Sequence, residues 1–368
     1  METLYYGIDL HSTQMTNHLI KKEGGVTTER INEKIYTNEI KEKLFPKLTK
    51  ETYVCVEAST GTFKFANMIK DFVKQVVVIN PIDFKALYCS GKKTDKIDSK
   101  KLANKLKYFI ESKDGDEDFP EVYVPKDFVI SLRKLFSSYN LLKSNKISLI
   151  NRIHSIFKSN LIYYKAEDLF ELVEKVFKDE RIDEVDKFQI DLLKSEVESL
   201  EKKINEIKKK ILEIGYKYFE EEIKLLISVK GVSDFTACAV MADVADVTRF
   251  KNAKKFCSYL RSAPRVDSTN RTTKIGKINK KGRKLAFELI LQGLNHIIKS
   301  TPRFEEFYDR KTKGKSKNKV RSAIVRKTFV SVYYMLKNKE IYRECDKKKY
   351  TMKLKEFEKN KKIFSQIV

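Results

Sequence analysis

The first 110 residues alternate between short apolar runs, rich in β-branched side chains, and segments with helical spacing. Strands are predicted at residues 4–12, 17–21, 52–59 and 75–81. The last of these runs is stopped by Asn80-Pro81, and residues 67–75 (NMIKDFVKQ) have the spacing of a helix. Because strands alternate with helices, this region is interpreted as an α/β layered domain with a partly parallel sheet.

Helical spacing returns at residues 90–106, where it places Asp95 and Asp98 three residues apart on one helix face. Residues 111–125 are acidic and contain one glycine and two prolines. They are interpreted as a linker between a domain at 1–110 and the helical region that follows.

A heptad repeat marks the second half of the helical region 126–216. Its apolar members recur at alternating spacings of three and four: Ile190, Leu193, Val197, Leu200, Ile204, Ile207, Ile211 and Ile214. Lys and Glu flank this seam, which predicts a coiled coil. The partner is either a preceding helix around Leu132–Leu161, in an antiparallel hairpin, or a second copy of the chain. The repeat alone favours neither alternative.

The region 217–340 reads as a mainly helical carboxy-terminal domain. Its first part predicts a helix, a tight turn at Gly231 and a second helix. This is either a helix–hairpin–helix-like turn, whose amides can hold a phosphate backbone, or an ordinary pair of helices. A polar, basic loop is expected at 265–284. A basic tail follows at 341–368, and its Lys-rich part after Asp346 is expected to be loosely ordered.

Net charge, length and hydrophobic content limit the classes of protein to which the chain can belong. The 368 residues include 76 Lys+Arg and 51 Asp+Glu, which gives a net charge of +25. That length suggests two or three domains, and 41% hydrophobic residues exclude a wholly disordered chain. So large a basic excess indicates a polyanionic partner, with a merely Lys-rich solvated surface as the alternative.

Cysteine use and hydropathy indicate the compartment. The five cysteines are scattered, no CxxC pair occurs and the four histidines lie far apart, so neither a zinc site nor a disulfide framework is expected. No apolar run approaches the length of a membrane span, and the start of the chain lacks the pattern of a secretory signal. We therefore expect a cytoplasmic protein without a membrane partner.

Four carboxylates are candidates for chemistry. Asp9 and Glu57 end predicted strands, and Asp95 and Asp98 lie one helical turn apart. Carboxylates at the ends of adjacent strands can converge on one edge of a sheet, where they repel one another unless a cation such as Mg²⁺ binds them. Such sites polarise phosphodiesters. Scattered surface acids are the alternative, because any segment of this length contains several.

Four segments carry a resemblance to a known family. In chain order they are GIDLHS, VEASTGTF, VVINPIDFKAL and KKTDKIDSKKLA. They resemble the amino-terminal domain of DEDD transposases of the insertion-sequence 110 family, which includes the pilin-gene inversion recombinases. The resemblance implies a ribonuclease-H/RuvC-like fold. It also implies that Asp9, Glu57, Asp95 and Asp98 form a catalytic, Mg²⁺-binding tetrad.

The resemblance continues over residues 4–340. NRIHSIF at 151–157 is similar to a helical segment of the family, and residues 226–260 are similar to the start of its carboxy-terminal transposase domain. The following loop resembles the one that bears the family's catalytic serine. The family usually has SG or SSN there, whereas this chain has Ser268-Thr269-Asn270. Ser268 is therefore the expected nucleophile, with Thr269 as the alternative.

The resemblance implies a bacterial, nucleoid-associated recombinase that cuts and rejoins DNA through a covalent serine–DNA intermediate. A structured noncoding RNA would guide it, and a homo-oligomer, a dimer or tetramer, would combine domains of different protomers in one active site. Basic residues expected to contact nucleic acid are Arg152, Lys274, Lys277, Lys280, Lys281, Arg283, Lys315, Lys319, Arg321 and Arg326. His11 is left outside the site.

Two other functions stay open from the sequence. A protein-only DNA invertase of the same fold would read DNA without RNA. A non-catalytic nucleic-acid-binding remnant of a decayed element would carry a drifted Ser268-Thr269 loop. The intact acidic tetrad and the intact reading frame argue against such decay.

Overall fold

The computed structural model describes most of the chain as two compact units, Met1–Ile130 and Ser131–Val368. The described residues are 2–11, 14–22, 25–31, 40–87, 94–112, 119–163, 169–177, 179, 181–269, 272–279 and 281–365. No helix in these ranges combines the length and apolar character needed to cross a membrane.

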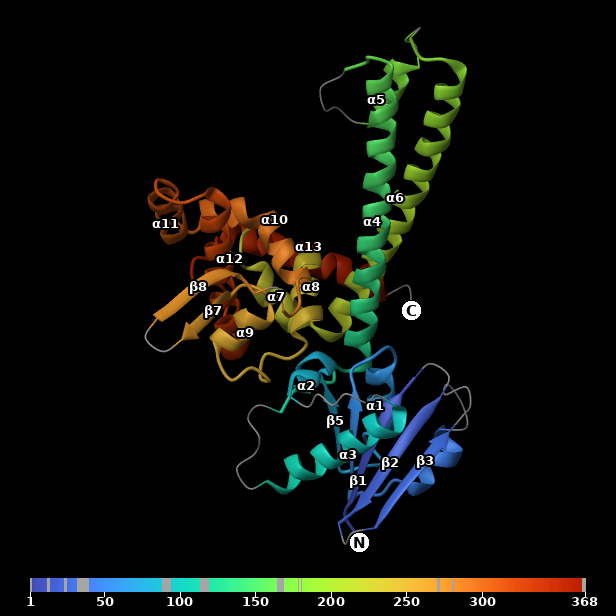
Figure 1. The fold of residues 1–368 in the computed structure, drawn as a ribbon. Coiled ribbons are helices and arrows are strands. Elements are labelled where there is room, and N and C mark those ends of the chain that lie inside the picture. Colours follow the sequence, from blue (N-terminus) through green and yellow to red (C-terminus); the bar gives the residue numbers. More distant parts are fainter. Residues whose placement is uncertain are drawn as a thin grey trace. The chain divides into compact units, whose positions relative to one another are not determined.

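The first unit is built on a six-stranded mixed sheet in the order β3-β2-β1-β4-β5-β6 (Figure 1). The strands are β1 (Leu4–Leu10), β2 (Met15–Lys21), β3 (Val26–Ile31), β4 (Thr52–Glu57), β5 (Gln75–Ile79) and β6 (Glu121–Val122). The central strands β1, β4 and β5 are parallel, and the other three strands pair antiparallel. The prediction of an α/β layer with a partly parallel sheet is confirmed.

Helices cover both faces of this sheet. They are α1 (Thr62–Ile69), α2 (Pro81–Leu87) and α3 (Asp95–Glu111), with two short helical segments, η1 (Ile40–Leu44) and η2 (Phe45–Lys47). Successive strand residues point to opposite faces, so Ile8 packs with Phe65 of α1 on one side, whereas Tyr5 packs with Leu102 of α3 on the other. The predicted helix at 67–75 is wrong in its bounds, because α1 starts five residues earlier and the chain turns before β5.

Gly7 determines how closely α3 approaches the sheet. A Cβ atom at Gly7 would lie 2.1 Å from the carbonyl oxygen of Ser99 and 2.3 Å from the amide nitrogen of Ala103. The backbone of α3 therefore crosses β1 directly at this glycine, an approach that no other residue permits. This crossing holds the amino-terminal end of α3 close to the carboxyl end of β1.

The second unit contains two long helices that run antiparallel (Figure 1). They are α4 (Asp127–Ser159), which begins in the first unit, and α6 (Glu184–Tyr218), with the short α5 (Leu169–Val176) between them. Lys146 of α4 forms an ion pair with Glu201 of α6, and Lys208 of α6 lies 5.9 Å from the ring of Tyr139 of α4. The heptad seam therefore faces α4 within the same chain.

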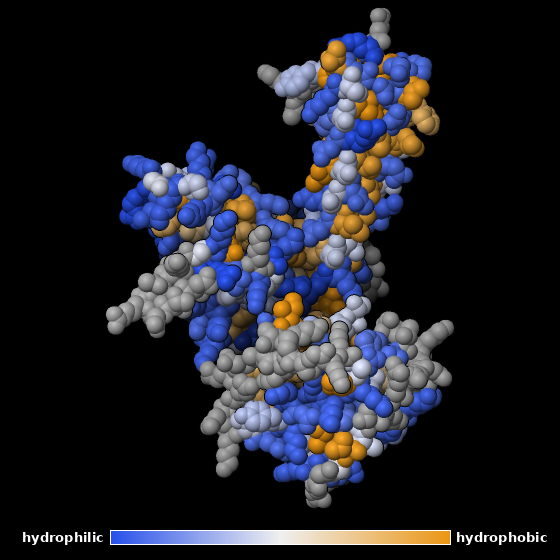
Figure 2. Space-filling view, viewed as in Figure 1, coloured by the Kyte–Doolittle hydropathy of each residue, from blue (hydrophilic) through white to orange (hydrophobic). Residues whose placement is uncertain are grey.

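Apolar side chains also lie on the outer surface of this helical hairpin (Figure 2). Leu141, Leu161, Phe188 and Leu192 are each more than half exposed. They are distinct from the hairpin's inner seam, in which Ile190 and Val197 are buried.

The remaining elements form a helical body with one hairpin of strands. They are α7 (Glu220–Ile227), α8 (Asp234–Val244), α9 (Ala253–Tyr259), β7 (Pro264–Thr269), β8 (Thr272–Ile278), α10 (Leu285–Ser300), α11 (Pro302–Thr312), α12 (Lys317–Asn338) and α13 (Lys347–Ser365). The turn between α7 and α8 packs on α10, because a Cβ at Gly231 would lie 2.7 Å from the carbonyl oxygen of Gly293. Gly231 also has a φ of +98°, a backbone conformation that glycine adopts more easily than any other residue.

The expectation of a loosely ordered tail is wrong, because α13 is anchored. Phe357 is fully buried, with its ring 4.4 Å from that of Tyr216. Lys353 donates hydrogen bonds to the carbonyl oxygens of Ile227 and Val232, each at 2.8 Å, and to that of Val229 at 3.2 Å. A run rich in lysine had suggested solvation, but its few apolar residues have the spacing of a packed helix.

Replacing Lys353 with methionine is expected to lower the free energy of unfolding by about 1–3 kcal/mol, because carbonyls at the end of α7 lose their donor. Burial already lowers the pKa of this ammonium, so its hydrogen bonds offset a desolvation cost. Urea denaturation of Lys353→Met beside the exposed Lys355→Met measures the difference. Equal midpoints for the two variants would show that Lys353 does not anchor α13.

Candidate functional site

Asp9, His11 and Asp95 meet at the carboxyl end of β1. The His11 Nε2 atom lies 3.2 Å from Asp9 Oδ2 and 3.6 Å from Asp95 Oδ1. One potential ligand atom from each residue lies within 4.8 Å of the others, which makes the three a possible metal-binding group. Asp9 is contributed by β1 and Asp95 by the first turn of α3, so the Gly7 crossing brings them together.

The start of α3 orients Asp95. Thr94 caps the helix by accepting a hydrogen bond from the amide of Ile97, which starts the helix at Asp95. The side-chain amide of Gln14 donates to Asp95 Oδ2 at 2.8 Å. The helix amino terminus is also a favourable place for a carboxylate.

The electrostatic environment of the Asp9 carboxylate favours a bound cation. Burial raises the pKa of its carboxyl above the usual value, the neighbouring His11 opposes this, and the charges of Asp95 and Asp98 raise the pKa further. A bound cation would remove this cost by neutralising the carboxylates. The described side chains therefore fit a hard divalent cation.

Glu57 lies at the same edge of the sheet as Asp9. In the parallel pair β1–β4, Ile8 is opposite Val56, so Asp9 and Glu57 are each the next residue along adjacent strands. The backbone carbonyl of Glu57 accepts a hydrogen bond from Thr62 Oγ1 at 2.8 Å, which fixes the start of α1. The Glu57 carboxylate is not a member of the Asp9–His11–Asp95 group in the described part of the chain.

Asp98 is also outside that group and lies 3.9 Å from Lys101 Nζ. The structure thus brings together two of the four predicted acids, with a third on the adjacent strand end and the fourth one helical turn away. His11 is the residue that the sequence reasoning left out. Its position two residues after Asp9 was the available signal, because i and i+2 share a side along an extended chain.

Ser268 and Thr269 end β7, in a two-stranded hairpin where a loop was expected. Ser268 is opposite Thr273, and Thr269 is opposite Thr272. β-branched residues along both segments favour the extended conformation, which explains the strands. The side chains of Ser268, Thr269 and Lys274 lie outside the described part of the structure, as do the whole residues Asn270 and Lys280.

The predicted nucleic-acid contacts whose side chains the structure describes differ in exposure. The exposed ones are Arg152, Lys277, Lys281, Lys315 and Lys319. Arg321 and Arg326 are half-buried on α12, and Arg321 donates to the side-chain oxygen of Asn295 at 2.5 Å and so ties α12 to α10.

Arg283 has a structural partner that the sequence did not reveal. Its Nε lies 2.9 Å from Oδ1 of Asp243, which is 1% exposed, and the other Asp243 oxygen accepts the amide of Ala286 at 2.9 Å. Arg133 donates to the carbonyl oxygens of Ala242 and Asp243 from α4. Arg283 therefore helps to hold α8 and the start of α10 together, whatever else it contacts.

Comparison with known proteins finds a similarity in the carboxy-terminal part of the chain. A curated protein of Pseudomonas aeruginosa, named "Probable family 20 transposase", is 28% identical over 80 residues. The similarity covers 22% of this chain and 24% of that relative, about a quarter of each. Residues 223–309, which include the β7–β8 hairpin, match the family model described as "Transposase IS116/IS110/IS902 family". Over these residues the chain is similar to this transposase family.

Proposed function

We propose that the protein is a DNA transposase or recombinase that cuts and rejoins DNA at a metal-dependent acidic site. The observation that supports this most is the convergence of Asp9, His11 and Asp95 at the end of a mixed sheet, beside the strand end that bears Glu57. The family match over residues 223–309 supports DNA as the partner.

The acidic residues would hold Mg²⁺, with Asp9 and Asp95 as direct ligands and Glu57 and Asp98 completing the tetrad. When bound, the ion polarises the scissile phosphodiester and stabilises its developing charge. Asp9 would be held for this task by its place in β1, and Asp95 by the Thr94 cap and Gln14. His11 would fix the orientation of the Asp9 carboxylate through their 3.2 Å contact.

The hydroxyl nucleophile is proposed on β7. The Ser268 oxygen would form a bond to the phosphorus while the bond to a deoxyribose oxygen breaks, and that oxygen would take up a proton. Attack by a hydroxyl of a second DNA would reverse the exchange and free the serine. Thr269 is the alternative nucleophile, although its β-methyl group crowds an in-line approach.

The domain plan proposed for this function has a RuvC-like part at 1–110, a linker at 111–125 that adds β6 to the sheet of the first unit, and a coiled-coil region at 126–216. The transposase part follows at 217–340, with a basic tail at 341–368. A guide RNA is proposed because a net charge of +25 suits a protein that holds two nucleic acids. A homo-oligomer is proposed because several large apolar side chains are exposed on the α4–α6 hairpin.

Covalent trapping tests the nucleophile. The protein is expressed with its native flanking DNA, cells are lysed in denaturant, and protein-linked DNA is detected for wild type, Ser268→Ala and Thr269→Ala. We expect the adduct to disappear in Ser268→Ala and to persist in Thr269→Ala, because only one oxygen bonds the phosphorus. An adduct that survives both changes would overturn the assignment to β7. Absence of any adduct in wild type would contradict covalent catalysis.

A further inference from the structure

A groove on the second unit runs along α12, and no residue predicted to contact nucleic acid lines it. One hollow of about 330 Å³ lies between α12 and the segment that follows it, and a second of about 500 Å³ lies between α11 and α12. Arg303, Val330 and Ser331 line both hollows, so the two are adjacent. The groove belongs to the second unit and the acidic cluster to the first.

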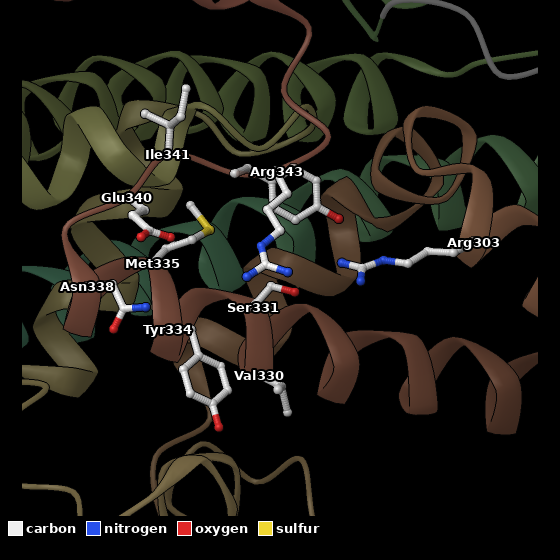
Figure 3. Close-up of a pocket in the computed structure, with 10 residues that line it drawn as sticks. Arg303, Val330, Ser331, Tyr334, Met335, Asn338, Glu340, Ile341 and Arg343 are labelled. Carbon is white, nitrogen blue, oxygen red and sulfur yellow. The ribbon is translucent and has the colours of Figure 1, made fainter.

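Two guanidinium groups converge in the first hollow. Figure 3 shows those of Arg303 and Arg343 turned toward one another beside Ser331. Glu344 neutralises Arg303 from one side at 2.9 Å, and the carboxylate of Glu340 also lines this hollow. No ion pair of Arg343 is found among the described residues. Like charges that face each other are unfavourable unless an anion lies between them. The arrangement therefore suits a phosphate group, which arginine can bind in a bidentate manner.

Aromatic rings accompany the cations in both hollows. Tyr334 is 52% exposed at the edge of the first hollow, although a tyrosine ring gains by being covered. In the second hollow, Lys327 Nζ lies 4.9 Å from the ring centre of Phe307. A repeated pairing of an aromatic ring with a cation is how proteins follow single-stranded nucleic acid, with rings for bases and cations for phosphates.

We propose that this groove binds an unpaired segment of nucleic acid, with a base on Tyr334 and the adjoining phosphate between Arg303 and Arg343. The groove then continues past Lys327 and Phe307 to the next nucleotide. Duplex DNA does not suit it, because stacked and paired bases cannot present a face to Tyr334. The inference rests on the proposed function only for the class of ligand, which is nucleic acid.

Fluorescence anisotropy tests the groove with the full-length protein in EDTA. The probes are a labelled oligothymidylate and a blunt duplex of the same length. Tyr334→Leu is expected to weaken oligothymidylate binding about tenfold, because stacking on one ring is lost, and to leave duplex binding unchanged. Arg343→Gln is expected to reduce the slope of log affinity against log salt by about 0.7, the value for one phosphate contact on a single strand.

Two variants serve as controls elsewhere on the second unit. Tyr218→Leu removes a ring that is 45% exposed, and Lys355→Gln removes one exposed positive charge. Both are expected to bind oligothymidylate like wild type. Wild-type affinity in Tyr334→Leu, or an equal loss for both probes, would overturn the groove assignment. This binding assay needs neither metal nor cleavage. If the protein cuts no DNA but Tyr334→Leu still weakens oligothymidylate binding, the proposed recombinase function is refuted and the groove assignment stands.

Discussion

Replacing Asp9 with asparagine is expected to reduce DNA cleavage and strand transfer by about three orders of magnitude or more. The change removes a carboxylate from the centre of the acidic cluster, where a bound cation contributes several kcal/mol to stabilising the transition state. The measurement is the rate of strand cleavage in DNA that carries the native flanks, at saturating Mg²⁺ and at saturating Mn²⁺.

The loss should not come from unfolding. Burial raises the pKa of Asp9, so the charged carboxylate is a cost to the metal-free fold, and the neutral amide should leave the melting temperature unchanged or higher. Asp71→Asn is a matched control, because Asp71 is an exposed acid in the same unit. Cleavage by Asp9→Asn at the rate of Asp71→Asn would contradict the catalytic role.

Replacing Gly7 with alanine is expected to destabilise the first unit by about 1–3 kcal/mol or more, and to weaken metal binding. The added methyl group would lie 2.1 Å from the Ser99 carbonyl oxygen, so the α3 backbone must move away from β1. That movement carries Asp95 away from Asp9 and His11. The measurements are urea denaturation and the rise in melting temperature on adding Mn²⁺.

Gly314→Ala is the control for this change, because a Cβ at Gly314 meets no atom within 4 Å. It should alter the free energy of unfolding by less than about 0.5 kcal/mol. If Gly7→Ala behaves like Gly314→Ala, close contact between α3 and β1 does not hold the cluster together.

The strands of the first unit were predictable where apolar side chains point to both faces of the sheet. The predictions at β1, β4 and β5 are confirmed, because the central strands of a covered sheet read as continuous apolar runs. The edge strand β3 (VTTERI) was not predicted, since its polar residues carry no such signal. The two-residue β6 is too short to leave a pattern.

The candidate site was predictable in part for a similar reason. The place of Asp9 and Glu57 at adjacent strand ends follows from parallel pairing, and the position of Asp95 follows from its helix cap. His11 joins Asp9 and Asp95 because of the backbone path just after β1 ends, and the hydrophobic periodicity of the sequence does not describe that path. The structural role of Arg283 depends on the buried Asp243, 40 residues earlier in the chain, and no local pattern connects them.

Binding of Mn²⁺, measured by electron paramagnetic resonance as the fall in the free-ion signal, tests the central claim most directly. The wild-type protein should bind the ion, Asp71→Asn should bind it equally well, and Asp9→Asn and Asp95→Asn should each bind it at least tenfold more weakly, because each loses an oxygen ligand. Equal binding by all four proteins would contradict a cation site at the carboxyl end of β1.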